Sequence, residues 1–421
     1  MLRKMVLFGV TSLMALAMPL ASQGNSEVTG IKPKPRNVTV PIQVAASNAR
    51  FDLWVQSFRA RALARGISAD VYDRAFRGVK YNPYVVEKDR NQSEFTKQIW
   101  EYLDTATSET RVRNGKSALA KHRALLVKIE KTYGVDYQVV LAIWGLESAY
   151  GAQKGDLPVI ESLATLAYDG RRQKFFESQL IAALKILQAG DVQPSAMKGS
   201  WAGAMGHTQF IPTSYLDFAQ DFRGDGKRDI WGSDPADALA STANYLKRSG
   251  WVHGQPWGVE VKLPASFDYS QSSERVKKPV ADWRAMGITT IDGKELPDHG
   301  TSSILLPAGA QGAAFLIFKN FQVIERYNTA DAYIIAVGHL GDRIMGRPEI
   351  QTQWPRGEKA LSFKQKKVMQ RLLRRRGIQL EKIDGIVGPD TIAAIRSFQA
   401  SIGVEPDGFA STDLLQQLRK R

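Results

Sequence analysis

The sequence predicts a mainly α-helical chain with a small strand-rich insert and a C-terminal three-helix module. Three observations support this. Apolar residues recur at helical spacing from about position 51 to about position 250. They alternate with polar residues just after position 258, as expected of strands. They return as three short helical stripes after position 359.

The first 21 residues have the layout of a secretory signal. Arg3 and Lys4 precede an apolar stretch from Met5 to Leu20, and small and polar residues follow. An uncleaved N-terminal anchor is the alternative, although the stretch is short for a membrane span. We therefore expect residues 1–21 to be a signal peptide and the protein to be periplasmic, with no cysteine that could carry a lipid. Residues 22–46 are polar and contain prolines, which predicts a flexible linker.

Composition limits the class of protein. A chain of 421 residues with 43% hydrophobic and 24% charged residues is globular and large enough for about two to four domains. The absence of cysteine excludes disulfides, thiol catalysis and zinc–thiolate sites. The formal net charge of +15 favours a polyanionic partner: nucleic acid, anionic lipid or an acidic cell-wall polymer. Export makes nucleic acid a poor candidate.

Helical periodicity covers much of the first 250 residues. It begins with Phe51, Trp54, Val55 and Phe58, which share one helix face. Further helices are expected at 118–133, 137–146, 175–189 and 236–247.

Residues 256–310 have a different pattern. Val259, Val261 and Leu263 alternate with polar residues, and turn formers follow. We expect a small strand-rich insert there, within a domain of residues 47–346. Helices should resume at 313–321 and 330–344.

A second break at 347–358 has two prolines and no periodicity, which predicts a linker to a unit at 359–421. In that unit Asp384-Gly385 and Asp407-Gly408 each precede a helix start. The two turns resemble a short internal repeat, so the unit should be three helices built from a duplicated half.

Glu147 directly follows eight uncharged residues, Val139 to Leu146, which predict a buried apolar helix that ends at this carboxylate. A carboxyl group there is poorly hydrated, so its pKa should rise. A carboxylic acid that stays protonated near neutral pH is what glycosidic bond cleavage requires of its general acid. A structural glutamate bonded to a neighbouring turn remains the alternative from this run alone.

Two loops could bind ligands. Residues 203–212 form a glycine-punctuated turn, in which Gln209 offers both donor and acceptor groups to a sugar; an ordinary helix-linking loop is the alternative.

In the second loop, aspartates occupy positions one, five and nine of a calcium-like pattern, but Arg223 and Gly232 depart from it. A tight acidic turn without metal is the alternative. The five histidines show no ligand spacing, which argues against a histidine metal site. The expected calcium ligands are Asp221, Asp225, Asp229 and Asp237.

Taken together, these residues resemble the lytic transglycosylases of the B type, family 3, which cleave bacterial cell-wall peptidoglycan. The resemblance covers residues 50–346 and rests on ordered blocks, and the unit at 359–421 resembles a three-helix peptidoglycan-binding domain through its Asp-Gly turns. The blocks are Glu147-Ser148-x-Tyr150-Gly151, Ser162–Tyr168 with Arg171-Arg172, Gly203–Pro212, the acidic loop with Trp231, Asn244-Tyr245-Leu246, and Arg326-Tyr327-Asn328 with Ala336–Leu340.

The resemblance implies a lysozyme-like, goose-type catalytic domain that needs no cofactor. It implies non-hydrolytic cleavage of the β-1,4 bond between N-acetylmuramic acid and N-acetylglucosamine, which leaves 1,6-anhydromuramyl ends. Glu147 would protonate the leaving oxygen and then accept the proton of the muramyl O6 hydroxyl. Substrate contacts would fall to Tyr102, Ser148, Tyr168, Arg171, Arg172, Gln209, Asn328 and Tyr333.

Two other functions stay open. One is a muramidase that uses water on the same scaffold, and its product would distinguish it. The other is a non-catalytic wall-binding scaffold, against which the presence of Glu147 argues. The expected partners are peptidoglycan strands and proteins of cell-wall synthesis, with no nucleic acid, and we expect a monomer.

Overall fold

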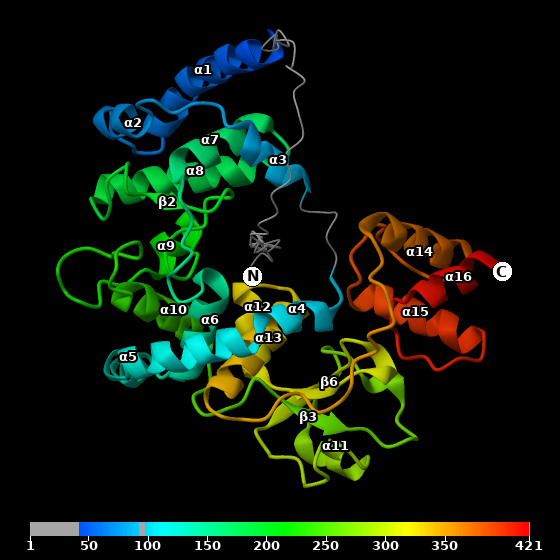
Figure 1. Cartoon of the computed structure of the whole chain (residues 1–421). Helices are drawn as coiled ribbons and strands as arrows, with labels where there is room; N and C mark the ends of the chain where they lie inside the picture. Colours follow the sequence, from blue (N-terminus) through cyan, green and yellow to red (C-terminus); the bar gives the residue numbers. More distant parts are fainter. Residues whose placement is uncertain (1–41, 92–96, 421) are drawn as a thin grey trace, which may run out of the picture.

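The computed structural model describes residues 42–91 and 97–420, which form a helical body, a sheet-containing insert and a C-terminal helical module (Figure 1). The expected signal peptide and most of the expected linker lie outside the described residues. The first helix begins at Ile42, inside the stretch expected to be linker. Within the described residues, no helix combines the length and the apolar composition needed to cross a bilayer.

One hydrophobic core lies under α7 and α8. Phe51 and Phe58 of α1 enter this core with almost no exposed surface, which explains the apolar spacing of that helix. Ser68 begins α2 by accepting a hydrogen bond from the backbone N–H of Val71, as N-cap serines do. The elements of this part are α1 (Ile42–Leu63), α2 (Ala69–Ala75), α3 (Pro83–Asn91), α7 (Val159–Asp169), α8 (Gln173–Ala189) and α9 (Pro212–Phe218), with the short ribbon of β1 (Leu157–Pro158) and β2 (Lys198–Gly199).

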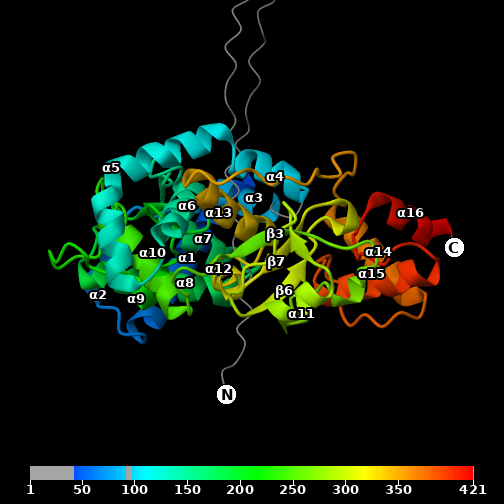
Figure 2. The ribbon, with the colours of Figure 1, turned by 90° about the horizontal axis from the view of Figure 1, so that it is seen from below.

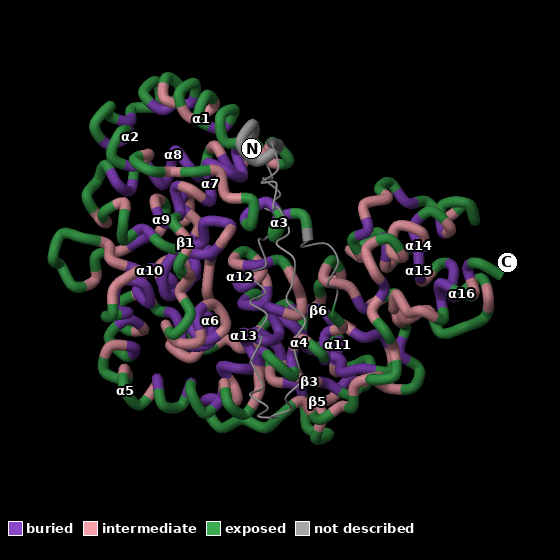
Figure 3. Tube along the Cα trace, turned by 45° about the horizontal axis from the view of Figure 1, so that its top comes forward, coloured by how far each residue is buried: buried purple, intermediate pink, exposed green. Residues whose placement is uncertain are grey.

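A second core surrounds α6. Residues Val140 to Ile143 of α6 are fully buried, which explains why this part of the helix carries no charge. Buried segments gather on α6 and α13, whereas α5 turns many exposed residues outward (Figure 3). The helices of this core are α4 (Ile99–Ala106), α5 (Glu109–Tyr133), α6 (Tyr137–Ser148), α10 (Ala236–Arg248), α12 (Lys319–Tyr327) and α13 (Asp331–Ile344).

The insert contains a five-stranded antiparallel sheet with the strand order β4-β6-β7-β3-β5. It lies between the helical body and the C-terminal module (Figure 2). A separate apolar cluster, which includes Trp283 of α11, covers one of its faces. The elements are β3 (Gly258–Lys262), β4 (Lys278–Pro279), α11 (Val280–Ala285), β5 (Thr289–Thr290), β6 (Thr301–Leu305) and β7 (Ala314–Ile317).

The prediction of a helix at 313–321 is wrong for the first half of that segment. Residues Ala314–Ile317 form β7, paired with β3 on one side and β6 on the other, so the sheet continues past the expected insert end at residue 310. Helix α12 begins only at Lys319. All four β7 residues are buried, and a short apolar run buried on both faces has no periodicity that separates strand from helix.

The C-terminal module has the expected three helices, α14 (Phe363–Arg375), α15 (Pro389–Ser401) and α16 (Thr412–Lys420). The internal repeat is visible in its hydrogen bonds. Gln370 donates to Asp384 and accepts from the N–H of Gly385. Gln399 makes the same two bonds with Asp407 and Gly408.

The segment expected to be a linker, 347–358, is held against α4 and β3. Arg356 forms an ion pair with Asp104 of α4, and the N–H groups of Gln351 and Thr352 donate to Glu260 of β3. This segment therefore follows a fixed path rather than acting as a free tether.

Candidate active site

Glu147 lies in the last turn of α6, immediately before the chain reverses. Ala149 and Tyr150 adopt left-handed backbone conformations, with φ of 50° and 58°. The ring of Tyr150 folds back under Gly145, where a Cβ atom would approach it to 2.5 Å. Its hydroxyl donates to the carbonyl of Arg111 over 3.1 Å, and Arg111 donates to the carbonyl of Gly145 over 2.7 Å. These contacts fix the end of the helix that carries the carboxylate.

The carboxyl of Glu147 contacts one phenol directly. Tyr333 of α13 donates a hydrogen bond to Oε1 of Glu147 over 2.5 Å. Burial raises the pKa of Glu147 to about 7, and the bond from Tyr333 partly opposes that rise because it favours the charged form. Burial also raises the pKa values of Tyr102 and Tyr327, and the nearby charge of Glu147 adds to both effects. The sequence-based expectation of a proton-holding carboxyl thus has a physical basis in the fold.

The loop at 203–212 faces the end of α6, and its key residue is strained. Gln209 has a φ of 54°. Among the described residues, Gln209, Ala149 and Tyr150 are the residues other than glycine with positive φ, and all three belong to the two turns at this site. Such conformations persist only where the surroundings enforce them, and they cluster at functional sites.

The amide groups of Gln209 and Asn328 have fixed orientations. Nε2 of Gln209 donates to the carbonyls of Lys154 and Gly206, each over 2.9 Å, which leaves Oε1 without a donor among the described residues. Oδ1 of Asn328 accepts from the N–H of Ala330 over 3.0 Å, which leaves Nδ2 without an acceptor in the same part of the chain. One residue therefore offers a free acceptor and the other a free donor.

His207 joins the two turns, although sequence reasoning gave it no role. Its Nδ1 lies 3.0 Å from Nε1 of Trp144, and its carbonyl accepts from Oγ of Ser148 over 2.6 Å. Ser148 also accepts from the N–H of Gly151 over 3.0 Å. No spacing in the sequence indicates these contacts, because His207 lies far from α6 along the chain.

Ser148, expected to contact substrate, is almost completely buried, and its hydroxyl already holds these bonds. Contact between this hydroxyl and a sugar would require them to change.

Tyr168, Arg171 and Arg172 lie on the side of the first core. The ring of Tyr168 packs edge-on against Phe51 at 5.5 Å. Both arginines pair with the buried carboxylate of Asp89, at 2.5 Å and 2.8 Å. Within the described residues, no hydrogen bond or ion pair joins these three side chains to Glu147. A substrate role for them stays a prediction.

The acidic loop uses its carboxylates internally. Asp221 accepts from the N–H groups of Gly224, Asp225 and Gly226, and Asp237 accepts from three others, at Phe222, Arg223 and Asp229. Arg223, at the third position of the calcium pattern, pairs with Asp234 over 2.7 Å. Within the described residues, the carboxylates of this loop do not converge as a group of three metal ligands. In this arrangement the loop is closed by its own backbone, and calcium binding by these aspartates stays a prediction.

Comparison with known proteins supports the same reading of both parts of the chain. The family model for the transglycosylase SLT domain matches residues 50–342, and that for a peptidoglycan binding domain matches residues 365–418. Membrane-bound lytic murein transglycosylase B of Escherichia coli K12 is 33% identical over 240 residues, which are 55% of this chain and 63% of that protein. The chain thus spans less than two thirds of the length of this curated relative.

Solved structures resemble most of this chain. Pseudomonas aeruginosa SltB3, crystallised in complex with NAG-anhNAM-pentapeptide, is 52% identical and has a TM-score of 0.86; the match covers 88% of this chain and 99% of that one. The Escherichia coli lytic transglycosylase Slt35, in complex with calcium, is 28% identical with a TM-score of 0.59, covering 71% of this chain and 93% of that one. These neighbours confirm the predicted fold class: mainly helical and lysozyme-like, with a C-terminal peptidoglycan-binding module.

Proposed function

The chain belongs to the transglycosylase SLT domain family, and we propose that it is a lytic transglycosylase that cleaves peptidoglycan strands and leaves 1,6-anhydromuramyl ends. The observation that carries this proposal is the single carboxyl of Glu147, with a pKa of about 7 and a phenol bonded to it. A carboxyl with a pKa near neutral pH can both donate a proton and accept one back during a single reaction cycle.

In the first step Glu147, in its protonated form, donates its proton to the glycosidic oxygen that leaves from C1 of the muramyl residue. No second carboxylate is needed if the acetamide of the same sugar supports the developing positive charge at C1. Asn328 Nδ2 and Gln209 Oε1 supply a free donor and a free acceptor for sugar amide groups. We assign their role as holding the acetamides in the reactive geometry.

In the second step the ionised Glu147 accepts the proton of the muramyl O6 hydroxyl while O6 forms a bond to C1. Glu147 is then protonated again and the sugar carries a 1,6-anhydro ring. The hydrogen bond from Tyr333 stabilises the carboxylate between the two steps, because it favours the charged form. The cycle consumes no water and needs no cofactor, since one side chain serves as both acid and base.

The module at residues 359–421 holds the enzyme on its polymer. The family match at residues 365–418 and the net charge of +15 support attraction to a wall that carries peptide and lactyl carboxylates. We propose that the enzyme acts in the periplasm as a monomer. The signal-like N-terminal sequence supports the location.

Product analysis tests the reaction. Purified protein is incubated with sacculi, and the released muropeptides are separated by mass, since an anhydro product is lighter than its hydrolytic counterpart by one water. Glu147→Gln should keep the fold and wall binding but lose at least about 100-fold in rate, because a general acid contributes about 10² to 10⁴. Reducing ends alone would show a muramidase. Undiminished activity of the variant would remove Glu147 from the mechanism.

A further inference from the structure

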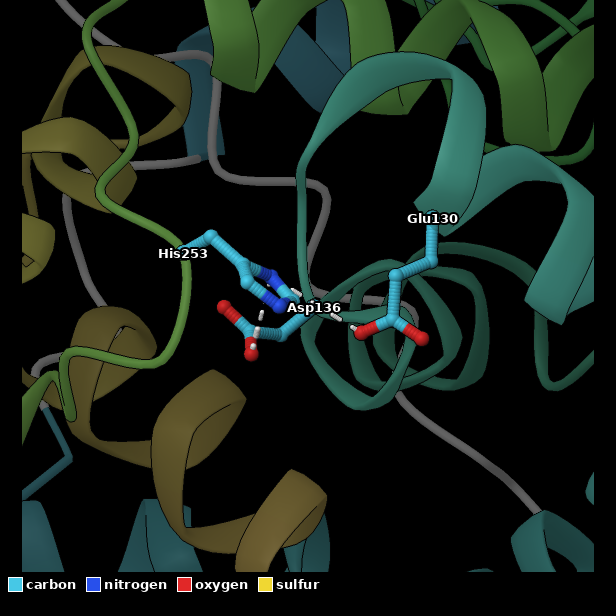
Figure 4. Close-up of side chains that lie close together, drawn as sticks. All are labelled: Glu130, Asp136 and His253. Atoms are coloured by element: carbon cyan, nitrogen blue, oxygen red, sulfur yellow. Dashed lines mark ion pairs between the residues drawn. The ribbon is translucent and has the colours of Figure 1, made fainter.

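Three side chains from distant parts of the chain converge at the opposite end of α6 from Glu147. Glu130 comes from the last turns of α5, Asp136 precedes the first residue of α6, and His253 lies in the loop after α10 (Figure 4). Nδ1 of His253 lies 3.4 Å from Oδ1 of Asp136 and 3.9 Å from Oε1 of Glu130. The active-site residues described above take no part in this cluster.

These separations are long for hydrogen bonds, which join nitrogen and oxygen at about 2.7–3.2 Å. The shorter separation matches the spacing of ligands around a tetrahedral ion, and the longer one exceeds it. Nitrogen and oxygen ligands about 2.0–2.2 Å from a tetrahedral ion stand roughly 3.4 Å from one another. One ligand atom from each of the three side chains lies within 4.8 Å of the other two. One separation in the cluster thus has the spacing of a metal site, and small side-chain movements would bring all three ligand atoms onto one ion.

The carboxylate of Asp136 is oriented by hydrogen-bond donors that contact mainly one of its two oxygens, Oδ2. Nε1 of Trp251 donates to Oδ2 over 2.7 Å, and the N–H of Gly254 donates to the same oxygen over 3.1 Å. Asp136 is buried, and outer donors of this kind orient the carboxylate ligands of metal sites. Oδ1 faces His253, and its one N–H contact, from Gly254, is longer at 3.2 Å.

Charge also favours a cation at this point. The carboxylate oxygens of Glu130 and Asp136 lie within 4.8 Å of one another. Two carboxylates therefore repel one another in a partly buried place, with one exposed imidazole between them. A divalent ion would neutralise both carboxylates, and the exposed side of His253 leaves access for water as a fourth ligand.

We propose that Glu130, Asp136 and His253 bind a divalent transition-metal ion of the zinc type. The nitrogen ligand favours zinc and its neighbours over calcium or magnesium, which prefer oxygen alone. The ion would join the end of α5, the start of α6 and the loop after α10. Its role is structural, because it clamps the base of the helix whose far end carries Glu147. No spacing along the chain indicates this site, because its three ligands lie on separate segments.

Zinc titration of the full-length protein tests the proposal. The protein is stripped with a chelator and dialysed, and zinc chloride is then added while heat release and thermal unfolding are measured. One zinc ion should bind per chain and raise the midpoint of unfolding. Glu130→Gln and His253→Ala should each weaken zinc binding at least about tenfold, as loss of even an outer-shell partner does.

Two variants serve as matched controls. His299→Ala removes a different histidine, whose bond to Gln255 uses only its backbone carbonyl, and Glu87→Gln removes an exposed carboxylate. Both should bind zinc as the unaltered protein does. The proposal is overturned if zinc fails to bind, or if the ligand variants bind as tightly as the controls. It is also overturned if His253→Ala lowers the unfolding midpoint by the same amount with and without zinc, since that identifies a simple ion pair.

Discussion

The indole Nε1 of Trp144 donates a hydrogen bond to Nδ1 of His207 over 3.0 Å, which settles the protonation of that ring. Because Nδ1 accepts, the ring proton lies on Nε2 and is donated to the carbonyl of Gly232 over 2.9 Å. Burial lowers the pKa of His207 to about 4, so the ring stays neutral at physiological pH. Trp144 lies one turn before Glu147, and a neutral His207 therefore helps to fix the helix end that carries the acid.

We expect His207→Phe to lower the free energy of unfolding by about 2–4 kcal/mol at pH 7, because it leaves two polar groups without their partner. The phenylalanine ring fills a similar volume, so packing changes little. Since the ring is a positioning group, kcat should fall more than KM changes. Thermal unfolding and steady-state kinetics on soluble glycan strands measure the two effects.

The dependence on pH separates this role from simple packing. In the unfolded chain His207 takes up a proton below about pH 6.5, whereas in the native protein it does so only below about pH 4. The unaltered protein therefore loses up to about 3 kcal/mol of stability as the pH falls through this window, and the phenylalanine variant does not. A stability difference between the two proteins that stays constant from pH 7 to pH 4 would contradict the assignment.

Tyr333→Phe should move the alkaline limb of the rate profile to higher pH. The phenol bond favours the ionised form of Glu147, so its loss lets the carboxyl keep its proton to a higher pH. A hydrogen bond to a charged group is worth about 1.5–3 kcal/mol, which corresponds to a displacement of about one pH unit or more. The profile of kcat/KM between pH 5 and pH 9 measures it, and a limb that moves to lower pH would be inconsistent with this contact.

Glu147→Gln should become more stable relative to the unaltered protein as the pH rises. Between about pH 4.5 and pH 7 the native protein keeps the Glu147 proton while the unfolded chain releases it, so stability falls with rising pH. Above pH 7 both states are ionised and the fall is complete, at about 3 kcal/mol. The glutamine variant escapes this loss. Denaturant unfolding of both proteins at pH 4.5 and pH 8 checks the sign and the size.

The sequence was sufficient to predict what depends on neighbours along the chain. The uncharged run before Glu147 predicted a buried helix and a raised pKa, and the two Asp-Gly turns predicted the repeat around Gln370 and Gln399. It could not predict contacts made across the fold. The bonds of Ser148 and His207 join segments far apart in sequence, and the strand at Ala314–Ile317 is defined by its two partners.

Calcium should not change the stability of protein that has first been stripped of metal with a chelator. The carboxylates of Asp221 and Asp237 already accept backbone N–H groups, and Arg223 occupies a ligand position of the calcium pattern. Calcium added at about millimolar concentration, the range of weak extracellular sites, should therefore not raise the unfolding midpoint. Asp237→Asn should destabilise the protein equally with and without calcium. A calcium-dependent rise that disappears in this variant would instead show a working ion site.

Removing the C-terminal module should weaken wall binding but leave catalysis of soluble strands. A cut after Glu358 keeps the ion pair of Arg356 with Asp104, so the segment that lies against α4 and β3 stays in place. It removes the contacts of the module with the insert, among them the ion pair of Arg275 with Asp390 and the bond of Arg396 to Ser272.

Because a second binding site raises the local concentration of substrate, the truncated protein should bind sacculi at least about tenfold more weakly. Its rate on short soluble glycans should stay within about twofold, since Glu147, Tyr333 and Gln209 all lie outside the module. Arg275→Ala in the full chain controls for loosened docking, because it breaks one exposed contact and keeps the module. Sedimentation with sacculi measures binding. Equal sedimentation of the truncated and full-length chains would mean that the catalytic domain alone holds the wall.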